Sequence, residues 1–202
     1  MKIQHLANGL FFGSLFALAM SCNNQSGSDK DADTTVAANT DTSSASAQAM
    51  PQAAHADITA TKSDTTGQGT AHFSRKDNGE VELELQLTFP KMANKSVAVH
   101  LHEHGDCGDA GNGAHGHWNP TNEQHGKWGD AAYHSGDIGN VQLNGEGKGE
   151  LKMSTNRWTI GGDDKTNILN RVVIVHSGVD DYKTQPSGAA GSRIGCGVIS
   201  GM

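Results

Sequence analysis

The sequence predicts an all-β domain: an antiparallel Greek-key sandwich or barrel of the immunoglobulin-like kind, carrying two long functional loops. Many of its short apolar segments are rich in β-branched residues or alternate between apolar and polar residues, as in VELELQL. Turn signals such as DNGE, NGEGKG and IGGDD separate these segments. No stretch shows a convincing helical period. Short strands joined by turns in this way favour a sandwich or a barrel.

Seven segments are expected to be strands. In chain order they are His55–Thr61, Gly69–Arg75, Val81–Thr88, Lys95–His102, Glu150–Ser154, Val172–His176 and Arg193–Ile199. The segments Gly105–Ile138 and Ser177–Ser192 between them are rich in glycine and too long to be simple connections. We therefore expect both of these loops to carry function.

The N-terminus has the pattern of an export signal. Lys2 provides a positive start, the stretch from Leu6 to Met20 is mostly apolar, and the small residue Ser21 precedes Cys22. The apolar core is short for a transmembrane span. Residues 1–21 thus resemble a bacterial lipoprotein signal, which implies acylation of Cys22 and a lipid anchor to a membrane. The alternative is a soluble secreted protein, because Ala19 stands where that signal usually has leucine.

Residues 22–54 are expected to be a disordered tether. Their composition is dominated by Asn, Ser, Asp, Thr, Ala and Gln, without aromatic residues, so they cannot bury enough apolar surface to fold. Residues 55–202 fit one domain. The net charge of −7 becomes −8 when the signal, which holds one lysine and no acid, is removed. We expect no nucleic-acid partner.

Export would place the three cysteines in an oxidising compartment. If Cys22 carries lipid, Cys107 and Cys196 remain as one possible pair. A bond between them would close a loop of roughly 90 residues, worth on the order of 4 kcal/mol of stability in the chain-entropy model.

The segment VHLHEHGDC at positions 99–107 contains half of a metal site. His100 and His102 alternate with apolar residues, so a strand would place both imidazoles on one face, about 7 Å apart. Two imidazoles on one face can converge on a single metal ion. The apolar segment VVIV then delivers a further imidazole from the sheet at His176.

The first long loop is dense in histidine, and neutral imidazole suits copper and zinc. Three of its histidines and an aspartate, at spacings of 8, 9 and 3, can fold back as a tetrahedral set. These residues are His117, His125, His134 and Asp137. An aspartate among histidine ligands suits zinc better than cuprous copper.

Five motifs, VHLHEHGDC, HWNP, YHSGDIGN, VVIVH and GSRIGCGVI, follow one another in the sequence. Together they resemble the copper/zinc superoxide dismutases, in the bacterial envelope-lipoprotein form, from about His55 to the C-terminus. The resemblance implies an enzyme that converts superoxide to dioxygen and hydrogen peroxide with copper and zinc as cofactors, exported to the bacterial cell envelope, in the periplasm or at the surface.

The resemblance also assigns site residues. His117 precedes the run Trp118-Asn119-Pro120, which makes it the histidine shared by both metals. The copper ligands implied are His100, His102, His117 and His176, and the zinc ligands are His117, His125, His134 and Asp137. The carboxylate linking the two sites falls on Asp180, with Asp181 as a near competitor.

Two further assignments follow from the same resemblance. Arg193 would guide the anionic substrate and act with His117 in catalysis, and Cys107–Cys196 would be the structural disulfide. The segment ILNRVVIVH resembles dimer-forming members, so a homodimer is possible.

Two questions stay open on the sequence. His104 and His115 are either exposed loop residues or an auxiliary copper-capture site. The whole protein could also be a copper- or zinc-binding storage or delivery protein on the same fold. The complete ligand set and Arg193 favour the enzyme.

Overall fold

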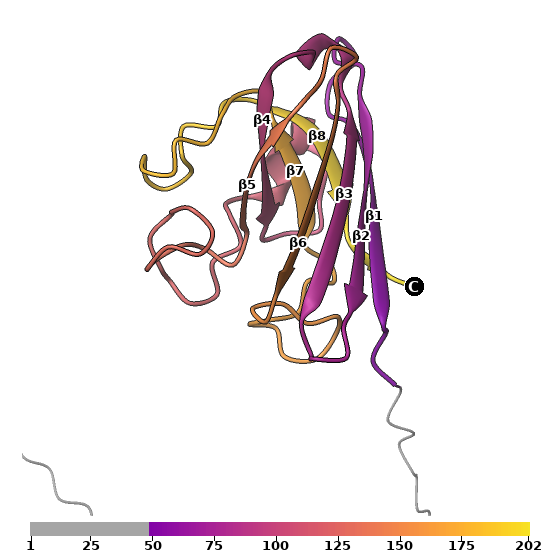
Figure 1. Ribbon diagram of the computed structural model, residues 1–202, viewed down its shortest axis with the longest axis vertical. Helices are drawn as coiled ribbons and strands as arrows, with labels where there is room; N and C mark the ends of the chain where they lie inside the picture. Colours follow the sequence, from indigo (N-terminus) through magenta and orange to yellow (C-terminus); the bar gives the residue numbers. More distant parts are fainter. Residues whose placement is uncertain (1–48) are drawn as a thin grey trace, which may run out of the picture. The chain divides into compact units, whose positions relative to one another are not determined.

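The computed structural model describes residues 49–202, which form an antiparallel, nearly closed β-barrel or sandwich (Figure 1). This confirms the predicted fold class. The expected signal, Cys22 and most of the expected tether lie outside the described residues. Within the described part of the chain, no helix is both long and apolar enough to cross a membrane.

Nine strands and two short 3-10 helices make up the domain. The strands are β1 (Ala53–Ala60), β2 (Gln68–Arg75), β3 (Val81–Thr88), β4 (Ser96–His102), β5 (Asp137–Gln142), β6 (Lys148–Thr155), β7 (Val172–His176), β8 (Arg193–Val198) and β9 (Ser200–Gly201). The 3-10 helices are η1 (Pro90–Met92) and η2 (Asp109–Ala114).

The strand order is β5-β4-β7-β8-β1-β2-β3-β6, and β9 pairs with β1. Neighbouring strands are antiparallel. β5 and β6, the two ends of this order, approach each other, which nearly closes the barrel. The chain leaves β4 for β5 and β6 and then returns beside β4 as β7, so residues far apart in the sequence share one sheet region.

Alternation along the strands explains the core. In β3, Val81, Leu83 and Leu85 are buried against the interior, whereas Glu82 and Glu84 alternate with them on the other face. β4 differs because it is buried on both faces. Val99 and Leu101 face the core, and His100 and His102 lie on the opposite face. That second face is where the two long loops pack.

The structure corrects the sequence prediction at three places. β5 was not predicted, because DIGNVQ is short and contains Gly139, which has a φ of +114°. Since β5 begins at Asp137, the first long loop ends at 136 and not at 138. β1 begins at Ala53, two residues before the predicted strand His55–Thr61. The last predicted strand is interrupted at Ile199, after which β9 forms a separate pair with β1.

Candidate metal centre

Three histidines are held by the sheet. His100 and His102 lie on β4, and His176 ends β7, where the β4–β7 ladder pairs Val99 with Val175. The ring centroids of His100 and His176 are 5.0 Å apart, and the Nε2 atoms of His102 and His176 are 3.4 Å apart. All three side chains are buried. The backbone ladder therefore fixes three imidazoles around one point.

Each of these rings has one nitrogen occupied by the protein. His100 Nε2 is 2.8 Å from Asp180 Oδ2, His102 Nδ1 is 2.9 Å from the carbonyl of His115, and His176 Nδ1 is 3.2 Å from the carbonyl of Gly191. Donation at these atoms leaves the lone pair on the other ring nitrogen, which faces the cluster. Partners of this kind fix both the tautomer and the orientation of a metal-binding histidine.

Burial also keeps the rings of His102, His117 and His176 neutral. Desolvation lowers the pKa of His102 well below its ordinary value, with nearby His117 adding to the effect. Desolvation similarly lowers the pKa of His117 to about 4 and that of His176 to about 3. At neutral pH these imidazoles therefore carry a free lone pair, which is the form that binds metals.

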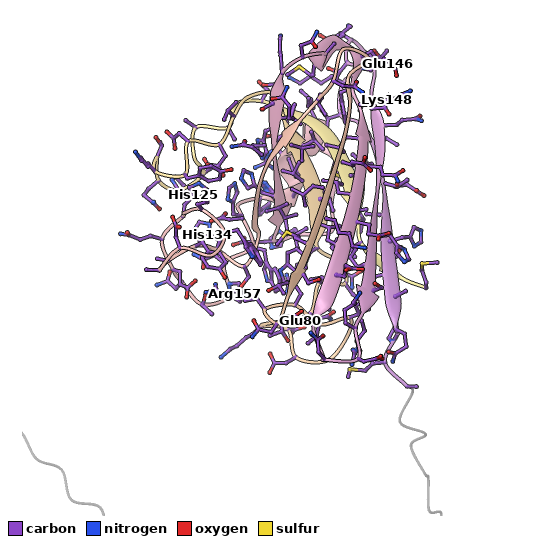
Figure 2. All side chains as sticks on the ribbon, viewed as in Figure 1. Glu80, His125, His134, Glu146, Lys148 and Arg157 are labelled. Atoms are coloured by element: carbon purple, nitrogen blue, oxygen red, sulfur yellow. A yellow bond between two sulfur atoms is a disulfide. The ribbon has the colours of Figure 1, made fainter. Side chains whose placement is uncertain are left out.

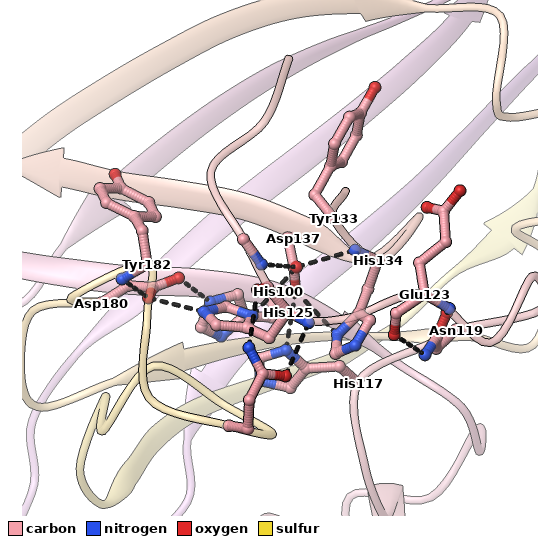
Figure 3. A network of polar contacts seen from close by, with 12 residues as sticks. His100, His117, Asn119, Glu123, His125, Tyr133, His134, Asp137, Asp180 and Tyr182 are labelled. Atoms are coloured by element: carbon pink, nitrogen blue, oxygen red, sulfur yellow. Dashed lines mark hydrogen bonds and ion pairs between the residues drawn. The ribbon is translucent and has the colours of Figure 1, made fainter. Parts of the chain in front are cut away.

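A second cluster surrounds Asp137 (Figure 3). The Nδ1 atoms of His117, His125 and His134 lie 2.8, 3.0 and 3.2 Å from its carboxylate oxygens. Oδ2 of Asp137 also accepts the backbone N–H groups of Gly126 and His134, at 3.1 and 2.9 Å. Burial opposes ionisation, but the ring nitrogens of the three histidines close to the carboxylate hold the pKa of Asp137 well below its usual range. Three nitrogens and a carboxylate thus converge.

Asp180 connects the two clusters. Its carboxylate accepts hydrogen bonds from His100 Nε2 and His125 Nε2, each at 2.8 Å, and from the backbone N–H of Tyr182 at 2.7 Å. Against the effect of burial, Asp137 and Asp180 raise the pKa of His125 to about 9. Asp181 is exposed and bonds to Thr184 instead. Of the two aspartates left open by the sequence, Asp180 is the one placed between the clusters.

His117 belongs to both clusters. His100, His102, His117 and His176 bring one ligand atom each within 4.8 Å of one another, and so do His117, His125, His134 and Asp137. His117 Nδ1 faces Asp137, and its Nε2 is buried without a hydrogen-bond partner among the described residues. The side chain of His115 is exposed. The geometry therefore singles out His117 and not His115.

The buried nitrogens fit metal ions. Within the described part of the chain, His100 Nδ1, His117 Nε2, His125 Nδ1 and His134 Nδ1 have no partner with hydrogen-bond geometry. A buried unsatisfied polar atom costs about 1–3 kcal/mol, so four such nitrogens at one place fit a site that coordinates metal ions. Four imidazoles suit copper, and three imidazoles with a carboxylate suit zinc.

Arg193, the first residue of β8, lies at the mouth of the site. A pocket of about 450 Å³ is lined by Arg193, His102, His117 and His176, among others. The guanidinium donates to the carbonyls of Gly111 and His115, which holds it at the rim. It is half-buried, so it remains accessible from solvent.

The predicted disulfide is present. It joins Cys107, in the loop after β4, to Cys196 on β8, with Cα atoms 5.8 Å apart. The bond ties the loop that carries Gly111 and His115 to the strand that carries Arg193.

Sequence reasoning missed three residues that position the centre. Gln185 donates to the carbonyl of His125 and accepts its N–H, both at 2.9 Å. Asn140 accepts the N–H of Asp180 and donates to its carbonyl. Gly188 has a φ of +65°, and a Cβ there would collide with Asp180 Oδ1. Only the glycine carries a signal in the sequence, as part of the PSGAAG turn.

The labelled histidines of Figure 2 locate the second cluster. His125 and His134 lie on the loops beside the barrel, whereas Glu146 and Lys148 lie at one end of the strands. Three features define the class of this protein: an antiparallel β-barrel, two buried histidine clusters and one imidazole that the clusters share. It is a β-barrel protein with a paired metal centre.

The sequence profile described as copper/zinc superoxide dismutase (SODC) matches residues 67–199. The chain belongs to the copper/zinc superoxide dismutase family. It is 31% identical over 151 residues to "Superoxide dismutase [Cu-Zn] 2" of Aquifex aeolicus, covering 72% of this chain and 85% of that protein. The family's metals are copper and zinc, in agreement with the donor sets described above.

Two further similarities extend the comparison. "Superoxide dismutase-like protein YojM" of Bacillus subtilis is 29% identical over 140 residues, which cover 67% of this chain and 71% of that protein. The crystal structure of the clock protein EA4 superposes with a TM-score of 0.67 at 27% identity, covering 76% of this chain and 97% of that one.

Proposed function

We propose that this protein dismutates superoxide at the cell envelope, converting two superoxide radicals and two protons into dioxygen and hydrogen peroxide. The observation that carries the proposal is His117, whose two ring nitrogens face different clusters. His100, His102, His117 and His176 would hold copper, and His117, His125, His134 and Asp137 would hold zinc.

The protein's own contribution is proton handling and orientation. When bound, copper supplies one-electron exchange, and zinc supplies a positive charge that favours loss of the second ring proton of His117. His117 Nε2 then takes up a proton in one half of the cycle and returns it to the nascent peroxide in the other. Asp180 accepts hydrogen bonds from His100 and His125 and so fixes the positions of both rings during both half-reactions.

Arg193 is proposed to attract the substrate. The full chain has a net charge of −7, so its overall field opposes the approach of an anion. A fixed guanidinium beside His102 and His176 provides a local positive focus at the pocket mouth. Its hydrogen bonds to the carbonyls of Gly111 and His115 keep that charge in one place.

The direct test measures metal content and superoxide consumption on the same purified sample. The proposal predicts one copper and one zinc in the buried centre and fast consumption of superoxide. Full loading of both metals without superoxide consumption would instead support the alternative of a storage or delivery protein. That alternative gives no role to Arg193 at the mouth.

The envelope location rests on the sequence. We propose that Cys22 is the acylated N-terminus after removal of residues 1–21, that residues 22–54 tether the domain, and that the lipid holds it at a membrane. One acyl chain binds membranes only marginally, so stable anchoring needs more than one. Intact-mass measurement of protein extracted from cell envelopes tests this: a mass without lipid would overturn it.

A homodimer is proposed on the family resemblance alone. The apolar side chains of Ile168, Val172, Val173, Ile174 and Val175 are buried within the domain, so this segment does not itself offer them to a second copy. Sedimentation equilibrium of the folded domain distinguishes one copy from two.

A further inference from the structure

A third group of metal-binding side chains lies on the surface, outside the paired centre. An antiparallel bridge pairs His102 with His117. The N–H of Glu103 continues this pairing by donating to the carbonyl of Gly116, at 3.1 Å. Two residues beyond the bridge on each side, His104 and His115 are therefore cross-strand neighbours, which brings their side chains together.

The side chains meet in a geometry that a metal ion can use. The ring centroids of His104 and His115 are 4.0 Å apart, with planes inclined by 50°. Glu103, His104 and His115 bring one ligand atom each within 4.8 Å of one another. Both histidines are exposed, and Glu103 is half-buried. The ligands thus face solvent, from which an ion and its remaining water ligands can come.

We propose that Glu103, His104 and His115 form a third, surface site for a divalent transition-metal ion. Two imidazole nitrogens and one carboxylate oxygen are donors for Cu²⁺ and Zn²⁺, and Cu²⁺ binds more tightly to such a set because of the general order of affinities. The site shares no side chain with the buried centre. It accounts for two histidines to which the proposed dismutation gives no role.

The backbone of this site is fixed before any ion arrives. The carbonyl of His115 accepts from His102 Nδ1 and from Arg193, so this residue cannot shift without disturbing the pocket mouth. Arg171 donates to the carbonyl of Glu103, at 2.7 Å. The Cys107–Cys196 disulfide closes the same region. Ligands on a rigid backbone lose less conformational freedom on binding, which favours affinity.

The test uses the holoprotein with copper and zinc already bound in the buried centre. Equilibrium dialysis against buffered Cu²⁺, and separately against Zn²⁺, measures uptake beyond those two ions. We expect one further Cu²⁺ per chain, with a weaker response to Zn²⁺. Electron paramagnetic resonance of the added Cu²⁺ should show coupling to the nitrogens of two imidazoles.

Three variants locate the ion. Losing even an outer-shell partner of a metal site typically weakens affinity about 10–100-fold, so His104→Ala, which removes a direct ligand, should weaken it at least tenfold. Glu103→Gln keeps the shape and removes only the charge, so it should weaken binding less. His72→Ala, which removes an exposed histidine on β2, is the matched control and should bind like the wild type.

His115→Gly provides an independent variant, because glycine readily adopts the φ of 61° and ψ of −139° found there. It should also lose the further ion, while circular dichroism stays unchanged. The proposal is overturned if the wild type takes up no ion beyond the two in the centre. It is equally overturned if His104→Ala and His72→Ala take up the same amount as the wild type.

Discussion

His100, His102 and His176 lie on paired strands, whereas His125 and His134 lie on a loop that depends on side-chain contacts for its position. The ladder between β4 and β7 places the first three. The carboxylate of Asp137 lies 3.0 and 3.2 Å from the Nδ1 atoms of His125 and His134. Asp180 and Gln185 form hydrogen bonds with His125. This difference indicates that strand pairing positions most of the proposed copper ligands. The proposed zinc ligands on the loop depend instead on a network of polar contacts.

His117 joins the two halves, so its removal should have the largest effect. His117→Ala leaves three imidazoles for copper but removes both the shared ligand and the proton carrier. Loss of a positioned proton donor typically costs a factor of 10²–10⁴, so superoxide turnover should fall by about 100-fold or more. Metal content should fall less, and zinc more than copper. Pulse radiolysis and elemental analysis of one sample measure both.

The control for this variant is His72→Ala, which removes an exposed histidine on β2 that belongs to neither cluster. Near-normal turnover with full metal loading in His117→Ala would contradict the assignment.

Asp180→Asn should separate the two halves. Asparagine keeps the shape but cannot accept from both His100 Nε2 and His125 Nε2. His100 stays on its strand, whereas His125 loses an anchor, so zinc affinity should fall about 10–100-fold and copper affinity less. Competition with a chromogenic chelator measures both affinities.

Asp181→Asn is the matched control, because that side chain is exposed and bonds only within its own turn. Gly188→Ala should reproduce the Asp180 phenotype, since its Cβ would displace the Asp180 carboxylate. Equal losses of copper and zinc in Asp180→Asn would mean that the two halves are not held differently.

Arg193→Ala should have a smaller effect, which is confined to substrate approach. Electrostatic steering can raise association rates tenfold or more, so we expect a loss of about tenfold with normal metal contents. The rate of the wild type should fall with ionic strength, and this slope should flatten in the variant. Arg193→Lys should keep much of the rate. An unchanged rate and salt slope in Arg193→Ala would remove the steering role.

The smallest expected effect is the pH dependence of stability in the metal-free protein. The pKa values of His117 and His176, lowered by burial to about 4 and about 3, make the unfolded chain bind more protons below about pH 6.5. The depressed pKa of Asp137 acts in the same direction at lower pH. The free energy of unfolding should therefore decrease as pH falls from 6.5 to 3.

His125 has the opposite sign. Its pKa is raised to about 9 by Asp137 and Asp180, so its contribution is present below pH 6.5 and is lost as pH rises through 9. Urea unfolding of metal-free protein should show maximal stability near pH 6.5, with the steeper loss on the acid side. A stability that increases steadily from pH 6.5 to 9 would contradict this assignment of charges.

The same contrast explains what the sequence could predict. Period-two alternation revealed β3 and β4, and with β4 the facing pair His100 and His102, because a strand fixes where successive side chains point. β5 was not predicted because its six residues include a glycine and show little alternation between apolar and polar side chains. The local sequence pattern therefore located the metal-binding residues that lie on strands.

The loop-borne half depends on tertiary contacts that no local pattern records. Neighbouring Asp180 and Asp181 look alike in the sequence, and only the folded loop buries the first and exposes the second. Gln185 and Asn140 hold His125 and Asp180 across 60 and 40 residues of chain. The resemblance to a family suggested the ligands, but the network that supports them required the structure.

Diffraction from crystals of the copper- and zinc-loaded protein, recorded at the absorption edges of both metals, tests the shared imidazole most directly. The account predicts one copper at His117 Nε2, together with His100, His102 and His176, and one zinc at His117 Nδ1, together with His125, His134 and Asp137. Two ions bound without His117 between them, or a single ion in the buried centre, would contradict it.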